Sequence, residues 1–228
     1  MTNEKTLLAA ILAMSATSAI AANPTAVLKV KGTLTNAACT PTLDNGGVVD
    51  YGTINLGELS ATAVNQLGQK NINLTINCTA ATKLSWNLID ERSSSNAKLT
   101  VENASALGNS LDDDRMTYGV GKAGNVNIGS YGMFVKVDGV TADGQGVTAI
   151  STDYYDSGVK WAKSADGITA GSFRDFSVAA FGSSSTPVAF KTATFPLVTS
   201  LAIQNTSTLA ITDDTAMDGE LTISLRYL

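Results

Sequence analysis

Histidine is missing from the 228-residue sequence. Its absence excludes a Ser-His-Asp triad, a Cys-His pair and any metal centre that requires imidazole. Basic clusters are missing as well, and the net charge is −5. This acidic balance argues against nucleic acid or an anionic lipid surface as a partner.

Long apolar runs are missing too, apart from a short one at residues 7–14. Lys5 precedes this run, and the small residues "AIA" end it at Ala21, which is typical of a secretory signal peptide. The run is too short to span a bilayer as a helix. We expect residues 1–21 to be cleaved and the rest to be exported as a soluble chain. A short buried helix is the alternative.

Cysteine is scarce, with only Cys39 and Cys78 present. In an oxidising compartment the default expectation is that they form a disulfide. On the chain-entropy model such a bond stabilises the fold by roughly 4 kcal/mol. Two buried free thiols are the alternative.

Helical periodicity is hard to find after residue 21, and short alternating stretches bounded by Gly, Asn, Asp and Ser recur instead. In "NINLTINC" (71–78) every second residue, from Ile72 to Cys78, is apolar or cysteine. Such alternation predicts strands with one face in a core, and hence an all-β antiparallel sandwich or barrel. Further predicted strands cover residues 83–89, 131–137, 175–181, 188–195, 200–205 and 208–212.

The middle of the chain, residues 103–172, is rich in Gly, Asp and Ser. Turn signals at this spacing predict short strands joined by long loops. No linker or abrupt change of composition marks a second domain. One sandwich with an enlarged, loop-rich middle is therefore expected.

Both ends of the exported chain carry alternating segments without an obvious neighbouring partner. Near the start, Ala26, Leu28 and Val30 alternate with other residues in "AVLKVK". At the end, "GELTISLRYL" places apolar or aromatic side chains at every second position, namely Leu221, Ile223, Leu225 and Tyr227.

The chain resembles the fimbrial subunits (pilins) of the bacterial chaperone–usher pathway. Four features carry the resemblance: the signal peptide, "VKGTLTNAAC" before the first cysteine, a second cysteine 39 positions later on a strand, and the alternating C-terminal strand with tyrosine second from last. They cover both ends and the first third of the exported chain, whereas the middle shows no such likeness.

The resemblance implies an incomplete immunoglobulin-like sandwich that is completed by donor-strand addition. Residues 22–31 would be the donor extension, with Ala26, Leu28 and Val30 as groove-filling side chains, and residues 32–228 the pilin-like domain. Leu221, Ile223, Leu225 and Tyr227 would line the groove edge, and Cys39 and Cys78 would join the first two strands.

The function implied is that of a structural subunit of a surface fimbria, with no enzymatic activity and no cofactor. Its partners would be a periplasmic pilus chaperone, an outer-membrane usher and neighbouring subunits, on a route through the periplasm to the cell surface. Burying four such side chains could contribute roughly 6–12 kcal/mol at most, which is comparable to the net stability of a domain. Pairing of the last strand within a complete sandwich is the alternative.

The sequence gives less support to a cofactor site, a metal site or a catalytic site. "GVGKAG" (119–124) fits a dinucleotide-binding pattern but is not followed by a helix, so a turn is expected. "DDD" (112–114) lacks the spacing of a calcium loop and is interpreted as a solvated turn, so no metal site is expected. Paired carboxylates of a carbohydrate-active enzyme are not identifiable.

A second functional hypothesis is an adhesin-like minor or tip subunit that binds a host glycan. Tyr154, Tyr155 and Trp161 lie among polar residues in the loop-rich middle and could stack on a sugar. Packing against neighbouring strands is the alternative role for these aromatic side chains.

Overall fold

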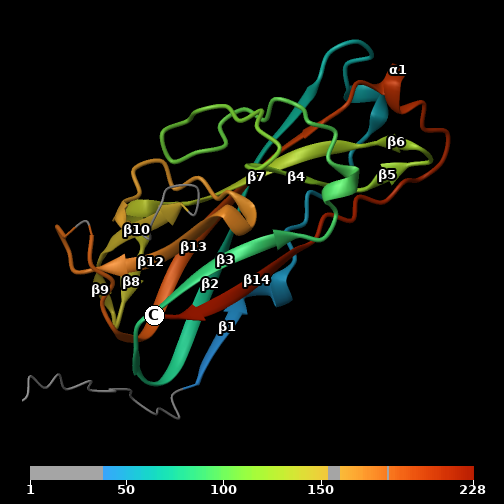
Figure 1. Ribbon diagram of the computed structural model, residues 1–228. Coiled ribbons are helices and arrows are strands. Elements are labelled where there is room, and N and C mark those ends of the chain that lie inside the picture. The colour runs from blue at the N-terminus through green and yellow to red at the C-terminus, as the bar shows by residue number, and fades with distance from the viewer. Residues whose placement is uncertain (1–37, 154–159, 184) are drawn as a thin grey trace, which may run out of the picture. The chain divides into compact units, whose positions relative to one another are not determined.

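Two antiparallel sheets pack face to face in the computed structural model, which describes residues 38–153, 160–183 and 185–228 (Figure 1). Sheet A has the order β1-β2-β13-β7-β4, and sheet B the order β11-β10-β12-β3-β14. The strands of sheet A are β1 (Cys39–Leu43), β2 (Asn65–Thr82), β4 (Thr117–Gly119), β7 (Gly129–Val135) and β13 (Phe190–Ile203), with β8 (Thr141–Ala142) and β9 (Gln145–Gly146) beside β13.

The strands of sheet B are β3 (Leu84–Asp90), β10 (Thr148–Asp153), β11 (Ala162–Lys163), β12 (Arg174–Ala179) and β14 (Leu221–Tyr227). A separate hairpin consists of β5 (Lys122–Ala123) and β6 (Val126–Asn127). The helical turns are α1 (Thr206–Leu209) and the 3-10 segments η1 (Asp44–Gly47), η2 (Leu56–Glu58), η3 (Ser93–Ser95), η4 (Val137–Gly139) and η5 (Gly171–Phe173). Within the described residues, no helix has the length and apolarity needed to cross a membrane.

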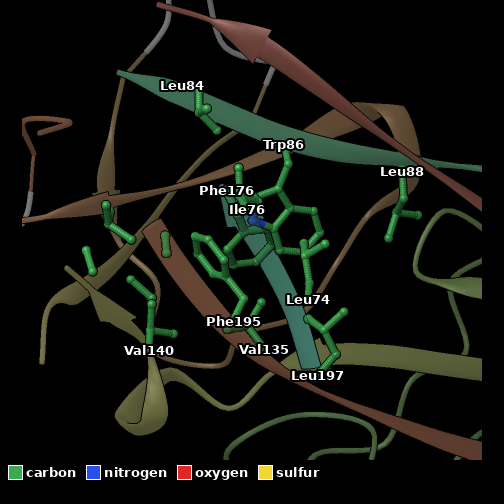
Figure 2. Packing of buried hydrophobic residues seen from close by; sticks show 14 of the residues in the cluster. Leu74, Ile76, Leu84, Trp86, Leu88, Val135, Val140, Phe176, Phe195 and Leu197 are labelled. Atoms are coloured by element: carbon green, nitrogen blue, oxygen red, sulfur yellow. The ribbon is translucent and has the colours of Figure 1, made fainter. Parts of the chain in front are cut away.

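The main core lies between the two sheets and is centred on Trp86 of β3 (Figure 2). Its indole stacks on Phe176 of β12, with ring centroids 5.2 Å apart, and meets Phe195 of β13 edge to face at 5.5 Å. All three side chains are fully buried. Leu74 and Ile76 of β2 pack in the same cluster, as the alternation in "NINLTINC" predicts. The predicted all-β sandwich is thus confirmed.

One long strand replaces two of the predicted ones. β13 runs through Pro196, where the sequence predicts a break between residues 195 and 200. Proline lacks the N–H that a central strand donates to its neighbour. The strand continues because β8 pairs with β13 only at Ala193 and Thr194, whereas β7 begins to pair at Leu197. Pro196 therefore lies at the point where the strand beside β13 changes from β8 to β7.

The strand predicted at residues 208–212 is wrong. Residues 206–209 form the helical turn α1, and the side chain of Asn205 caps it by accepting a hydrogen bond from Thr208 N at 2.8 Å. Ala210 ends the turn with a left-handed backbone, φ 46°. A local capping interaction thus overrides the alternation of "TLAIT".

Short strands and loops make up the middle of the chain, as predicted. The segment 96–116 packs on the face of sheet A that points away from the main core, where Val101, Ala104 and Leu111 form a cluster with Ile168 and Ala202. It is tied to the sheet by polar contacts, including Ser200 Oγ donating to Asn103 O at 2.7 Å. The enlarged middle therefore covers the second face of sheet A.

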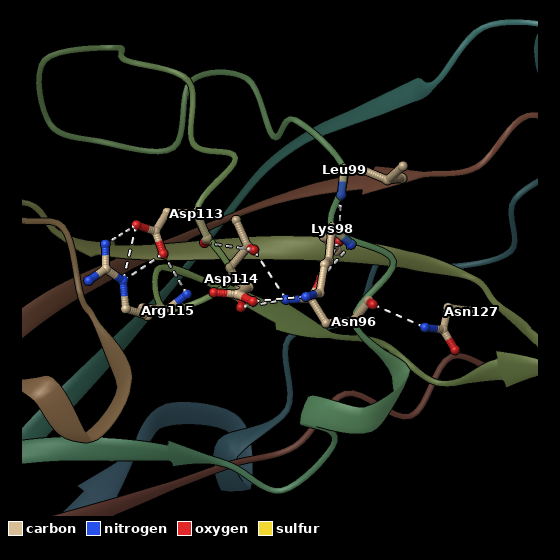
Figure 3. Close-up of polar contacts among 9 residues, drawn as sticks. Asn96, Lys98, Leu99, Asp113, Asp114, Arg115 and Asn127 are labelled. Atoms are coloured by element: carbon tan, nitrogen blue, oxygen red, sulfur yellow. Dashed lines mark hydrogen bonds and ion pairs between the residues drawn. The ribbon is translucent and has the colours of Figure 1, made fainter.

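A buried asparagine holds this segment in place (Figure 3). Asn96 donates through Nδ2 to Thr117 O at 2.8 Å, and its Oδ1 accepts from Ser130 Oγ at 2.6 Å and from Lys98 N at 2.8 Å. Asn127 Nδ2 donates to Asn96 O at 3.0 Å. The Asn96 side chain thus links its own segment to Thr117 of β4 and Ser130 of β7.

The acidic turn "DDD" lies beside this network and is occupied by ion pairs (Figure 3). Asp113 contacts the guanidinium of Arg115, whose hydrogen bonds lower the pKa of the carboxyl to about 2. Asp114 pairs with Lys98 at 2.9 Å. These contacts give two of the three carboxylates a structural role.

The disulfide provides a first testable prediction. Cys39 and Cys78 are bonded across the β1–β2 pair, which confirms the expected bridge. Replacing both residues by serine should lower the free energy of unfolding by about 2–4 kcal/mol, because the unfolded chain loses a constraint. Urea denaturation followed by circular dichroism measures this change.

A reducing agent supplies the control for this experiment. Reduction should destabilise the wild-type protein by the same amount and leave the double serine variant unchanged. Equal stability of the oxidised wild type and the variant would contradict the prediction.

Trp86 provides a second prediction. Trp86→Ala should lower the free energy of unfolding by about 3–5 kcal/mol, since it opens a cavity in the main core. Trp86→Phe should cost less than half of that. The indole Nε1 is buried and has no hydrogen-bond partner among the described residues, so its loss removes an unsatisfied donor together with some packing. Denaturant unfolding of both variants makes the comparison, and equal losses would contradict it.

Candidate functional site

The last strand, β14, lies at an edge of sheet B (Figure 1). It pairs along its whole length with β3, from Leu221 opposite Asp90 to Tyr227 opposite Leu84. Its other edge has no strand partner within the described residues. The side chains of Leu221, Ile223 and Leu225 are only half-buried, although they pack against the main core.

The first described strand, β1, is the corresponding edge of sheet A, where it pairs with β2 alone. β1 and β14 meet at one end, where Cys39 N donates a hydrogen bond to the hydroxyl of Tyr227 at 3.0 Å. We call this contact the closed end. Away from it the two strands border an apolar hollow.

This hollow, called the groove below, has two connected parts. The narrower part has a volume of about 370 Å³ and lies between Pro41, Leu43 and Gly47 on one side and Ile223 on the other, over Leu74. The wider part, called the chamber, has a volume of about 810 Å³ and shares Leu43, Gly47 and Ile223 with the narrow part. Its aliphatic lining comes from the loops as well as the strands: Val48, Val49, Ile54, Ile72, Val120, Ile128, Leu197, Leu201, Ile203, Leu209, Ile211, Met217 and Leu221.

Two tyrosines line the chamber and carry no charge near neutral pH. Burial raises the pKa of Tyr131 well above its ordinary value, with a further contribution from the nearby Asp90 carboxylate. Burial also raises the pKa of Tyr51, whose hydroxyl is hydrogen-bonded to Thr199 at 3.0 Å. The lining is therefore apolar or neutral, apart from carboxylates at its mouth.

Those carboxylates belong to Asp50, Asp213 and Asp214, which are all exposed and line the chamber. We call them the acidic rim. Asp213 and Asp214 lie in the segment that leads into β14, so the rim is at the Leu221 end of the strand, opposite the closed end. Gly219 lets this segment pass close to its neighbours, because a Cβ there would approach Gly119 O and Tyr131 Cε1 to 3.0 Å, a tight contact.

Ion pairs hold β14 and the segment before it in position. Arg92 contacts Asp218 at 3.2 Å and Glu220 at 2.9 Å. On the face of sheet B opposite the core, Arg226 Nη1 lies 3.3 Å from the buried carboxylate of Asp175, whose pKa is raised by desolvation. β14 is thus fixed to the rest of the domain while its second edge has no neighbour within the described residues.

The predicted site residues lie in different places in the structure, and some lie outside the described residues. Leu221 and Ile223 line the groove, and Leu225 packs against the main core. Tyr227 is 51% exposed and contributes its hydroxyl to the closed end. The predicted donor residues Ala26, Leu28 and Val30 lie outside the described residues. So do Tyr154 and Tyr155, while Trp161 is half-buried and immediately precedes β11.

The loops that form the chamber were not predicted from the sequence. Tyr51 and Met217 lie outside any alternating stretch, and Ile211 lies in the stretch 208–212 that was wrongly predicted as a strand, so periodicity gave no reason to place them in a cavity wall. The available signal was the apolar content of "GGVVDYGTINLG" (46–57) and of residues 209–217, which is unusual for loops that face water.

Comparison with known proteins identifies the relatives of the chain. A family described as "Protein of unknown function (DUF1120)" matches residues 28–132. Uncharacterized protein YhcF of Escherichia coli (strain K12) is 35% identical over 162 residues, which cover 66% of each chain. The descriptions of this family and of YhcF do not name a fimbrial subunit, and neither does that of the relative reported in the next paragraph.

Protein GltF of Escherichia coli (strain K12) is 33% identical over 242 aligned residues. The alignment covers 96% of this chain and 95% of the relative, so the likeness includes both the sandwich and its enlarged middle. The chain therefore belongs to the family of Protein GltF.

Proposed function

We propose that this protein is a structural subunit of a bacterial surface fimbria, assembled by chaperone-assisted donor-strand exchange. The observation that carries the proposal is the apolar groove between β1 and β14. Both strands are sheet edges within the described part of the chain, and half-buried apolar side chains of β14 border the groove. An extended segment that pairs with β14 would satisfy its edge and cover these side chains.

The sequence of residues 22–31 fits such a segment. Ala26, Leu28 and Val30 form one apolar face, and their spacing matches that of Leu221, Ile223 and Leu225, because side chains of a strand alternate between faces. In this proposal the segment of one subunit fills the groove of the next. A periplasmic chaperone fills the groove before assembly, and an outer-membrane usher receives the subunit.

The need for a chaperone follows from the properties of a free edge. A strand with unpaired N–H and C=O groups and an apolar face is a template for unspecific pairing and aggregation. Burying a Leu or Ile side chain contributes about 1.5–3 kcal/mol relative to leaving it exposed. Three half-buried side chains and one free edge therefore give the groove a strong tendency to acquire a strand. The expected signal peptide and the disulfide support a periplasmic route.

The test uses two complementary variants of the full chain, co-expressed in the periplasm with tags of different size. Leu28→Asp destroys the donor face but leaves the groove intact. Ile223→Asp charges the groove wall but leaves the donor segment intact. Neither variant should form multimers alone. Together they should form one heterodimer that survives unheated SDS electrophoresis, whereas the wild-type chain should form a ladder.

Thr222→Asp is the matched control, since Thr222 neighbours Ile223 but points to the exposed face of β14; this variant should still form the ladder. The ability of Ile223→Asp to act as donor also shows that its chain is exported with an accessible donor segment. A wild-type chain that remains monomeric, or an Ile223→Asp chain that forms the wild-type ladder, would refute the proposed function.

A further inference from the structure

The two ends of the groove differ in charge as well as in width. At the closed end Tyr227 and Cys39 are joined by a neutral hydrogen bond. At the other end the chamber opens beneath the acidic rim of Asp50, Asp213 and Asp214. The acidic side chains that line the groove therefore gather at the Leu221 end of β14.

The rim carboxylates form no ion pair within the described residues, in contrast to their neighbours. Asp218 and Glu220 in the same segment are both paired with Arg92. No lysine or arginine lines the groove in the described part of the chain. Lys70 lies nearby, with its Nζ 6.0 Å from the centroid of the Tyr51 ring. The rim thus has capacity for a cation from a partner.

The segment that would fill the groove is polarised in a complementary way. Lys29 and Lys31 follow Leu28 and Val30, whereas no charged residue lies between Ala21 and Val27. In a strand with Leu28 and Val30 directed into the groove, both lysines lie on the opposite face, close to the mouth. The C-terminal end of the segment is therefore cationic, and its N-terminal end has no charged side chain.

We infer that the acidic rim binds Lys29 and Lys31 of a second copy of this chain and thereby fixes the direction of the inserted strand; this inference rests on the proposed function. The lysines lie at the chamber only when the segment runs antiparallel to β14. In the parallel direction they would lie near the closed end, away from all three carboxylates.

The same direction favours a segment that comes from another copy. With Lys31 at the chamber, residues 32–37 would have to return along the groove to Ala38, which precedes Cys39 at the closed end. Seven residue steps span at most about 25 Å when fully extended. The length of β14 is itself about 20 Å at ordinary strand rise. Return within one chain would leave almost no residues for a turn, so exchange between copies is favoured.

The experiment measures how fast the two complementary full-length variants combine after mixing. In one arm the acceptor (Leu28→Asp) additionally carries Asp213→Lys and Asp214→Lys. In a second arm the donor (Ile223→Asp) additionally carries Lys29→Glu and Lys31→Glu. Either change should slow heterodimer formation by at least about tenfold, because rim charges act mainly on association rates. Combining both changes should restore most of the rate.

The matched control is an acceptor with Asp112→Lys and Asp138→Lys, which changes the net charge equally at exposed positions outside the groove lining. It should combine at nearly the unmodified rate. The difference between rim and control variants should shrink from about 0.01 M to about 1 M salt, as the screening length falls from about 30 Å to about 3 Å.

The outcomes separate the two proposals. If the unmodified pair forms no heterodimer, the proposed function fails. If it forms one and the rim variants combine as fast as the control, strand exchange stands and the role of the acidic rim is refuted. Slower association without recovery in the charge-swapped pair would also refute direct pairing of the rim with Lys29 and Lys31.

Discussion

The free edge of β14 is the constraint on which the rest of this structure depends. Its backbone pairs with β3 on one side only, within the described residues, and the side chains that point inward are left half-exposed. Because apolar surface and unpaired peptide groups are both unfavourable in water, such an edge favours acquisition of a further strand. The groove, its rim and the proposed assembly all follow from this edge.

The domain is built so that the edge persists. The disulfide joins β1 to β2, Arg92 and Arg226 contact carboxylates beside and behind β14, and Gly219 lets the chain pass close to Tyr131. The enlarged middle covers the second face of sheet A, away from the groove. The enlarged middle therefore packs on the scaffold without closing the groove.

Much of the scaffold was readable from local patterns. Alternation in "NINLTINC" predicted which face of β2 enters the core, because a strand has a fixed period of two, and residues 83–89 were predicted as the strand that the structure shows as β3. Pattern analysis failed where a local or neighbouring interaction decided the outcome. Asn205 capped a helical turn where a strand was predicted, and the change of neighbour beside Pro196 allowed β13 to continue.

The sequence by itself determined the composition of the two terminal segments, the presence of one pair of cysteines and the all-β character of the chain, since these depend on residue type and short-range spacing alone. Only the tertiary structure decided that β1 and β14 are neighbouring edges, that loops far apart in sequence form the chamber, and that the carboxylates of the acidic rim lie at one end of it. Strand order and loop convergence arise from packing between distant residues, and a local pattern carries no record of that packing.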